Sequence, residues 1–140
     1  MLENGSKWLD MVFIGEFQVS FTGLGRIVLP KKIRELLKGN SFIVTKGFDK
    51  CLAGFDKGDW EDRANELLQV SLLEQENLDK RRFVFSSASS LEIDEQGRFV
   101  ISKNLLEFAG LNKKVTIIGV GDHFEIWDEE NWKKKIEASS

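Results

Sequence analysis

The sequence contains an internal repeat, which constrains the possible folds more than any other feature. When residues 94–132 are placed on residues 22–60, an offset of 72 positions, nine residue pairs are identical without a gap. The pairs are Gly25/Gly97, Arg26/Arg98, Val28/Val100, Lys31/Lys103, Glu35/Glu107, Asn40/Asn112, Gly47/Gly119, Asp56/Asp128 and Trp60/Trp132. The chain therefore contains two similar units. Because a unit of roughly 50 residues buries too little apolar surface to be stable alone, we expect the two units to pack together.

Each repeat has the pattern of a β-rich unit with one short helix. A strand leads to a turn that ends in Gly-Arg, a second short strand and a helix follow, and two further strands complete the repeat. The predicted strands are 16–21, 27–29, 41–45 and 51–55 in the first repeat, and 91–93, 99–101, 114–118 and 123–127 in the second. The sequence thus predicts a β-rich α+β fold.

The residue types at the helix ends indicate where the helices begin and stop. Proline is tolerated at a helix entry, serine and aspartate side chains can accept a first-turn N–H, and glycine readily ends a helix. On these grounds helices are predicted to begin at Pro30, Asp56, Ser102 and Asp128, and the two short ones are predicted to end at Gly39 and Gly110.

The repeats and the segments around them divide the chain into five predicted parts. They are an N-terminal extension (1–11), the first repeat (12–60), a helical linker (61–86), the second repeat (87–132) and a C-terminal tail (133–140). Between the repeats, 57–70 and 72–85 have helical patterns, and Ser86–Ser90 is predicted to be a short polar connector.

The composition excludes several kinds of site. The chain has one cysteine, Cys51, and one histidine, His123. It therefore cannot form an internal disulfide, which fits a reducing cytoplasm, and it cannot build a His/Cys metal cage. We expect no cofactor and no metal. The uncharged run Val115–Gly121 is far shorter than the about 20 residues of a spanning helix, so no membrane segment is expected.

Enzyme motifs are also missing or broken. Gly23 and Gly25 supply the first two glycines of a dinucleotide-binding GxGxxG motif, but Val28 stands at the third position. No GxxxxGK[ST] phosphate loop is present in the sequence. Cys51 and His123 occupy equivalent positions in the two repeats, so a Cys–His catalytic pair is disfavoured. The sequence predicts no catalytic residue and no small-molecule substrate.

Several motifs, taken in their order and spacing, are similar to those of one bacterial family. They are FIGEF (13–17), GRIVLPKKIREL (25–36), VTKGFDKCL (44–52) and DKGDWED (56–62) in the first half, and LEIDEQGRFVIS (91–102), EFAGL (107–111) and IGVGDHFEIW (118–127) in the second. The chain resembles the MraZ family of transcriptional regulators, which are built from two AbrB/SpoVT-like units.

This resemblance implies a fold, an assembly and a partner. The fold would be a pseudo-symmetric barrel of two swapped-hairpin units with linking and C-terminal helices. The assembly would be a homo-oligomeric ring that binds double-stranded DNA at short promoter repeats. The targets would be the division and cell-wall gene cluster and the protein's own promoter, which implies a cytoplasmic, nucleoid-associated regulator.

The family signature Asp-x-x-x-Arg is complete in only one half of this chain. The second half has Asp94 and Arg98, whereas Thr22 precedes Arg26 at the same spacing in the first half. Threonine can accept a turn hydrogen bond but cannot form the ion pair, which leaves Arg26 freer to reach a phosphate or a base. The predicted turn and support residues are Thr22, Gly25, Asp94, Gly97, Arg98 and Lys103.

The positive charge is concentrated in the first repeat. Residues 22–40 contain five basic side chains and one acidic one, a net charge of +4, whereas residues 94–112 contain two basic and three acidic ones, a net charge of −1. Because lysine and arginine neutralise phosphates and arginine can read guanine edges, the first repeat is predicted to carry the DNA-binding face. Its predicted residues are Arg26, Lys31, Lys32, Arg34 and Lys38.

Two other interpretations remain open from the residues alone. Lys31 and Lys32 can be solvated helix residues without a partner, and both Gly-Arg arginines can serve only to hold their turns. The whole chain can also be an oligomeric scaffold that binds a protein through exposed aromatic side chains and its acidic tail. Binding that weakens steeply with salt favours DNA, because counterions are released from the phosphates.

Overall fold

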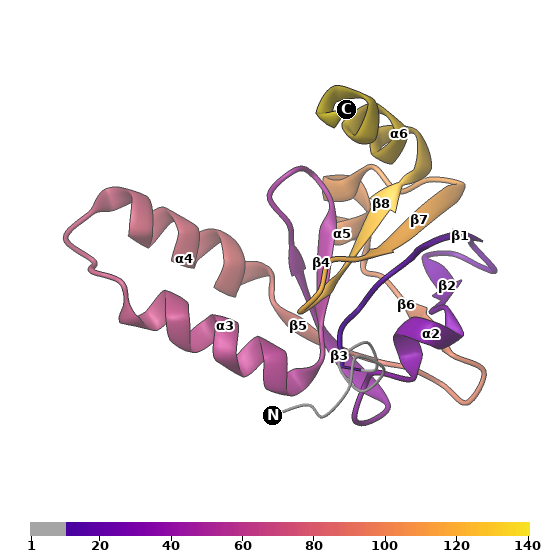
Figure 1. Cartoon of the computed structure of the whole chain (residues 1–140), viewed down its shortest axis with the longest axis horizontal. Coiled ribbons are helices and arrows are strands. Elements are labelled where there is room, and N and C mark those ends of the chain that lie inside the picture. Colours follow the sequence, from indigo (N-terminus) through magenta and orange to yellow (C-terminus); the bar gives the residue numbers. More distant parts are fainter. Residues whose placement is uncertain (1–10) are drawn as a thin grey trace.

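The computed structural model describes residues 11–140, and in these the strands form two antiparallel sheets (Figure 1). The predicted extension 1–11 lies outside the described residues except for Met11. The larger sheet has the order β1 (Glu16–Ser20), β7 (Lys114–Gly119), β8 (Phe124–Asp128), β4 (Leu52–Phe55), β3 (Ser41–Lys46) and β5 (Ser89–Glu92). The smaller sheet is a ribbon of β2 (Arg26–Val28) and β6 (Arg98–Val100). The fold is therefore α+β, as the sequence predicts.

Strands pair across the two repeats. β1 of the first repeat pairs with β7 of the second, β5 of the second pairs with β3 of the first, and β2 pairs with β6. Reciprocal backbone bonds join the turns: Leu29 N–H donates to Gly97 C=O, and Ile101 N–H donates to Gly25 C=O, both at 2.8 Å. Neither repeat can therefore complete its hydrogen bonding alone.

The barrel expected from the resemblance is not closed in residues 11–140. β1 and β5 are the edges of the six-stranded sheet, and β2 and β6 bond to each other instead of bridging those edges. The two sheets nevertheless enclose one core, because Ile27 of β2 and Phe99 of β6 belong to the same buried cluster as the large sheet.

The core is built around three fully buried or nearly fully buried aromatic rings. Phe42 meets Phe99 edge-on at 5.0 Å between ring centroids, and it meets Phe124 at 5.2 Å. The three residues come from β3, β6 and β8, so they join both sheets and both repeats. In β1, β2 and β6 more buried and more exposed residues alternate, which is the pattern expected of half-buried strands, whereas all four residues of β4 are buried.

The short helices follow the ribbon strands. α5 (Lys103–Ala109) is capped by the Ser102 hydroxyl, which accepts the Leu105 N–H at 3.4 Å, and it ends at Gly110 with a left-handed φ of 61°. Both ends match the prediction. α2 (Lys31–Arg34) begins after Pro30 as predicted, but it ends at Arg34, five residues before the predicted stop at Gly39.

The longer helices lie outside the core. α3 (Lys57–Gln69) and α4 (Gln75–Ser87) form an arm that projects from the sheets, and α6 (Glu129–Ser139) extends from β8 (Figure 1). Asp128 caps α6 by accepting the Asn131 N–H, as predicted. Asp56 does not cap α3; its carboxylate accepts the backbone N–H of Lys38 at 3.0 Å.

The predicted polar connector 86–90 is instead part of two regular elements. Ser86 and Ser87 complete α4, and Ser89 and Ser90 begin β5. Among the described residues, no helix is both long and apolar enough to cross a membrane.

Candidate nucleic-acid interface

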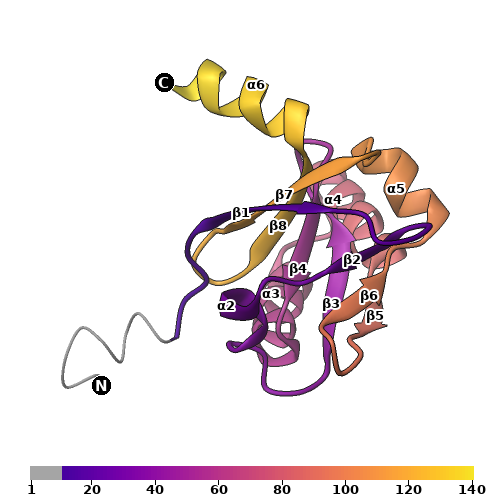
Figure 2. The ribbon, with the colours of Figure 1, turned by 90° about the vertical axis from the view of Figure 1, so that its right-hand side faces the viewer.

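The β2–β6 ribbon presents two arginines on its outer face. Ile27 and Phe99 are paired at its centre and point into the core, so the residues on either side of them face outward. These outward residues are Arg26, Val28, Arg98 and Val100, of which Val100 is 55% exposed. Figures 1 and 2 show the ribbon on the side of the molecule away from the α3–α4 arm.

Arg98 is held by the carboxylate of Asp94. Its Nε donates to Asp94 Oδ2 at 2.7 Å, and Asp94 Oδ1 accepts the backbone N–H groups of Gln96 and Arg98, both at 2.9 Å. The Arg98 N–H first, and the guanidinium with it, hold the pKa of Asp94 below its usual value. Gly97 closes this turn with a φ of 81°, which favours glycine.

Arg26 has a weaker clamp at the equivalent turn. Its Nε donates to the Thr22 hydroxyl at 3.3 Å and its guanidinium donates to the Thr22 C=O at 3.2 Å. Both distances are at or beyond the long end of protein hydrogen bonds, and neither acceptor is charged. Gly25 has a φ of 69° here, so both Gly-Arg turns use glycine for the same backbone reason.

The other predicted cations lie on α2 and beyond it. Lys31 and Lys32 are exposed, and Lys31 pairs with Glu35 at 3.8 Å, as its repeat equivalent Lys103 pairs with Glu107 at 4.0 Å. Lys38 is exposed after the helix, beside the start of α3.

Arg34 makes a contact between the repeats. Its guanidinium lies against Gly97, where any side chain would collide with it. The equivalent residue of the second repeat, Leu106, lies over Gly25 in the same way. The structure thus brings Arg26, Arg34 and Arg98 to the ribbon and its turns, whereas Lys38 lies next to Asp56 at the start of α3.

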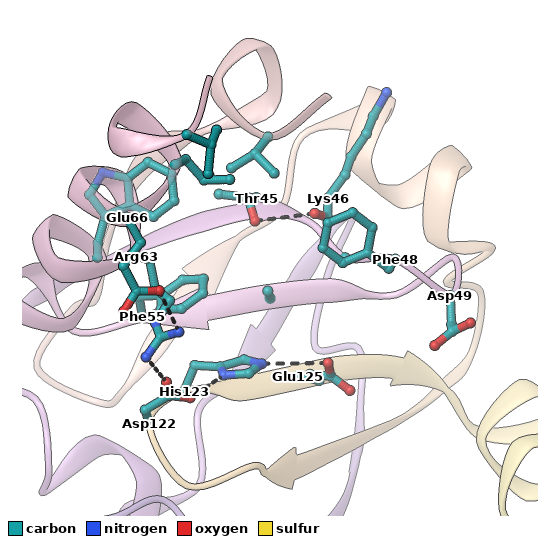
Figure 3. Close-up of a pocket in the computed structure, with 16 residues that line it drawn as sticks. Thr45, Lys46, Phe48, Asp49, Phe55, Arg63, Glu66, Asp122, His123 and Glu125 are labelled. Atoms are coloured by element: carbon teal, nitrogen blue, oxygen red, sulfur yellow. Dashed lines mark hydrogen bonds and ion pairs between the residues drawn. The ribbon is translucent and has the colours of Figure 1, made fainter. Parts of the chain in front are cut away.

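A pocket with a volume of about 560 Å³ lies between the arm and the sheet, and the sequence did not indicate it (Figure 3). Apolar side chains form much of its lining, among them Phe48, Phe55 and Trp60. At one side His123 stacks on Phe55, with ring centroids 4.9 Å apart. A ligand-sized pocket of this kind commonly has a few polar groups at its edge.

The polar edge of the pocket is a small charge cluster. His123 Nδ1 lies 2.7 Å from Asp122 and its Nε2 lies 3.5 Å from Glu125, while Arg63 of α3 pairs with Asp122 at 2.7 Å (Figure 3). The sequence motif Asp-His-x-Glu at 122–125 could have indicated this cluster. No sequence motif indicated that Arg63 of the arm would join it.

Replacing His123 by glutamine is expected to destabilise the protein more at low pH than at high pH. Burial lowers the pKa of His123, but the bonds to Glu125 and Asp122 outweigh it and raise the pKa above 6.5. Its contribution is therefore fully present below about pH 6.5 and is lost as the pH rises through the folded-state pKa. Urea unfolding of both proteins near pH 6 and near pH 9 measures the difference; an equal loss at both values contradicts the charged cluster.

Cys51 is expected to resist alkylation in the folded protein. It is 1% exposed, and burial first, with the Glu125 charge second, raises the pKa of its thiol to about 12. Since the thiolate is the reactive form, labelling at about pH 8 should wait for unfolding. Thiol titration in buffer and in denaturing urea tests this. Equal rates in both solutions would show that the thiol is accessible.

Among residues 11–140, no group of three or more His, Cys, Asp or Glu side chains is placed to hold a metal ion.

The sequence matches the family described as "MraZ protein, putative antitoxin-like" over residues 12–83 and again over 84–140. It is 43% identical over 125 residues to the transcriptional regulator MraZ of Caldicellulosiruptor bescii, covering 89% of this chain and 87% of that one. It is 35% identical over 127 residues to that of Roseiflexus castenholzii, covering 91% and 88%, and 39% identical over 122 residues to that of Ligilactobacillus salivarius, covering 87% and 85%. These relatives are named as regulators of transcription, not as enzymes. Two matched repeats and this degree of identity show that the chain belongs to the MraZ family.

Proposed function

We propose that the protein is a transcriptional regulator that binds double-stranded promoter DNA in a sequence-specific way. The observation that carries this proposal is the exposed β2–β6 ribbon with Arg26 on its outer face and the cationic helix α2 beside it. The proposed DNA-contacting residues are Arg26, Lys31, Lys32, Arg34 and Lys38. The proposed turn and support residues are Thr22, Gly25, Asp94, Gly97, Arg98 and Lys103.

The dimensions and chemistry of the ribbon support this proposal. The major groove of B-DNA is about 12 Å wide and admits a two-stranded β-ribbon. An arginine on the outer face of such a ribbon can donate two hydrogen bonds to a guanine edge, which specifies sequence. Lysines on an adjacent helix reach phosphates, which fix the position of the protein without specifying sequence.

We also propose a ring of identical subunits. In residues 11–140 both β1 and β5 have unpaired edges, and such edges invite pairing. A ring would repeat the ribbon around one face, so several weak contacts add when the promoter repeats match the subunit spacing. The two swapped-hairpin units would then be 12–60 and 87–132, joined by the linker 61–86 and followed by the tail 133–140.

The proposed targets are the division and cell-wall gene cluster and the protein's own promoter, in the cytoplasm and at the nucleoid. Fluorescence anisotropy with the DNA upstream of the gene, and with an unrelated fragment of equal length and base composition, tests this. We expect tight binding to the first fragment only. Equal weak binding to both would contradict sequence-specific regulation.

The second candidate is a scaffold for a protein partner. The observation that favours it is the exposed apolar connector of the arm, where Leu72 is 52% exposed and Leu73 is 97% exposed. A partner bound there would be held by apolar burial and would resist salt, whereas DNA affinity falls steeply as salt rises. The same anisotropy series, repeated at increasing salt, separates the two candidates.

A further inference from the structure

The ribbon has a local two-fold axis, but its two arginines are not held equally. Ile27 pairs with Phe99 at its centre, and these residues are equivalent in the two repeats. Arg26 and Arg98 are therefore related positions on the same outer face. Their clamps differ because residue 22 is threonine and the equivalent residue 94 is aspartate.

The charge of Arg98 is neutralised by the Asp94 carboxylate in the same turn. Its Nε lies 2.7 Å from Asp94 Oδ2, and the Asp94 carboxylate is fixed in turn by two backbone N–H groups. To bind a phosphate or a guanine, Arg98 must leave this charged partner or share it. Either way the carboxylate stays close to the DNA, where its own charge is unfavourable.

The charge of Arg26 is not neutralised by its clamp. Within the described part of the chain, no carboxylate oxygen lies within 4.0 Å of its guanidinium nitrogens. Its two bonds, to the Thr22 hydroxyl and C=O, are long and have uncharged acceptors. Such bonds hold the guanidinium over the turn, yet they are readily exchanged for bonds to a base or a phosphate.

We propose that Thr22 is a specificity-determining residue: it leaves Arg26 as the ribbon arginine available to DNA, so that the two-fold ribbon engages its site on one side. This inference rests on the proposed DNA-binding function and adds to it which half of the ribbon reads the site. Thr22 acts here as a positioning residue, through Arg26.

The test exchanges the clamp charges between the repeats. In Thr22→Asp a carboxylate pairs with Arg26. We expect affinity for the upstream DNA to fall roughly tenfold, and the slope of log affinity against log salt concentration to decrease by the equivalent of about one phosphate contact. In Asp94→Asn the amide oxygen still accepts the turn N–H groups while the charge is removed. We expect this variant to bind the upstream DNA more tightly, because Arg98 no longer pairs with a carboxylate. The salt slope should increase by the equivalent of about one phosphate contact.

Thr22→Asn is the matched control, since it has the shape of aspartate without the charge. We expect it to bind within about twofold of the wild type, with an unchanged salt slope. Thermal melting of all four proteins checks that the fold is retained, and a gain of binding in Asp94→Asn cannot arise from misfolding.

The possible results separate this inference from the function on which it rests. If the wild type binds upstream DNA selectively and the Thr22→Asp and Asp94→Asn variants have its affinity and salt slope, the one-sided ribbon is wrong and the regulator stands. If Thr22→Asn loses as much as Thr22→Asp, shape and not charge matters at this position, and the inference is overturned. If the wild type does not bind selectively, both proposals fail.

Discussion

Replacing Phe124 by alanine is expected to cost about 3–5 kcal/mol of the free energy of unfolding, the typical loss for a buried phenylalanine. Phe124 is fully buried, and its ring packs against Phe13 at 5.5 Å and Phe42 at 5.2 Å. The resulting cavity lies where strands of both repeats meet, so the whole molecule loses stability. Urea unfolding followed by tryptophan fluorescence measures the change.

The matched control for this variant is Leu73→Ala. Leu73 is also a large apolar residue, but it is 97% exposed, so we expect a change within about 0.5 kcal/mol. Because the repeats share one core, both variants should unfold in a single transition. Two separate transitions, or a loss below about 1 kcal/mol in Phe124→Ala, would contradict the shared core.

Replacing Arg26 by alanine is expected to weaken binding to the upstream DNA by roughly 10- to 100-fold, the range that corresponds to loss of a good arginine–base contact. The physical reason is the loss of the ribbon guanidinium that no carboxylate among residues 11–140 neutralises. The slope of affinity against salt should fall by about one if Arg26 contacts a phosphate. Anisotropy titrations across a salt series measure both quantities.

Arg82→Ala is the control for the loss of positive charge. Arg82 lies on α4 of the arm, with its side chain 63% exposed and paired with Asp79. The arm projects from the side of the molecule opposite the ribbon (Figure 1). We expect the affinity of this variant to match the wild type. If Arg82→Ala weakens binding as much as Arg26→Ala does, the DNA lies on another face.

The sequence predicted the local elements well because their signals are local. Each predicted strand overlaps an observed one; β3, for example, extends the predicted 41–45 by one residue to Lys46. The Gly-Arg turns were predictable because glycine alone readily adopts their positive φ. The caps at Ser102 and Asp128 were predictable because each side chain accepts an N–H three residues ahead.

The errors arose where a distant partner takes the place of a local one. Asp56 has the position of an N-cap, but its carboxylate accepts a hydrogen bond from the Lys38 N–H instead. The serines at 89 and 90 have the composition of a connector, but β3 offers them a strand to pair with. Local pattern carries no information on such contacts.

The candidate interface was predictable in part for the same reason. The repeat and the charge difference led to the prediction that Arg26 and the lysines of α2 contact DNA. They could not show that Arg34 lies over the turn of the other repeat at Gly97, or that Arg98 faces outward on the same ribbon as Arg26. Both facts depend on the pairing of β2 with β6, which no local signal encodes.

The most direct test of the account is to find whether promoter DNA contacts the proposed interface. A photo-crosslinking amino acid placed at Val100, on the outer face of the ribbon and 55% exposed, should crosslink to the upstream fragment. The same residue placed at Ile136 of α6, which is 49% exposed, should not. Crosslinking from position 136 without crosslinking from position 100 would contradict the proposed interface.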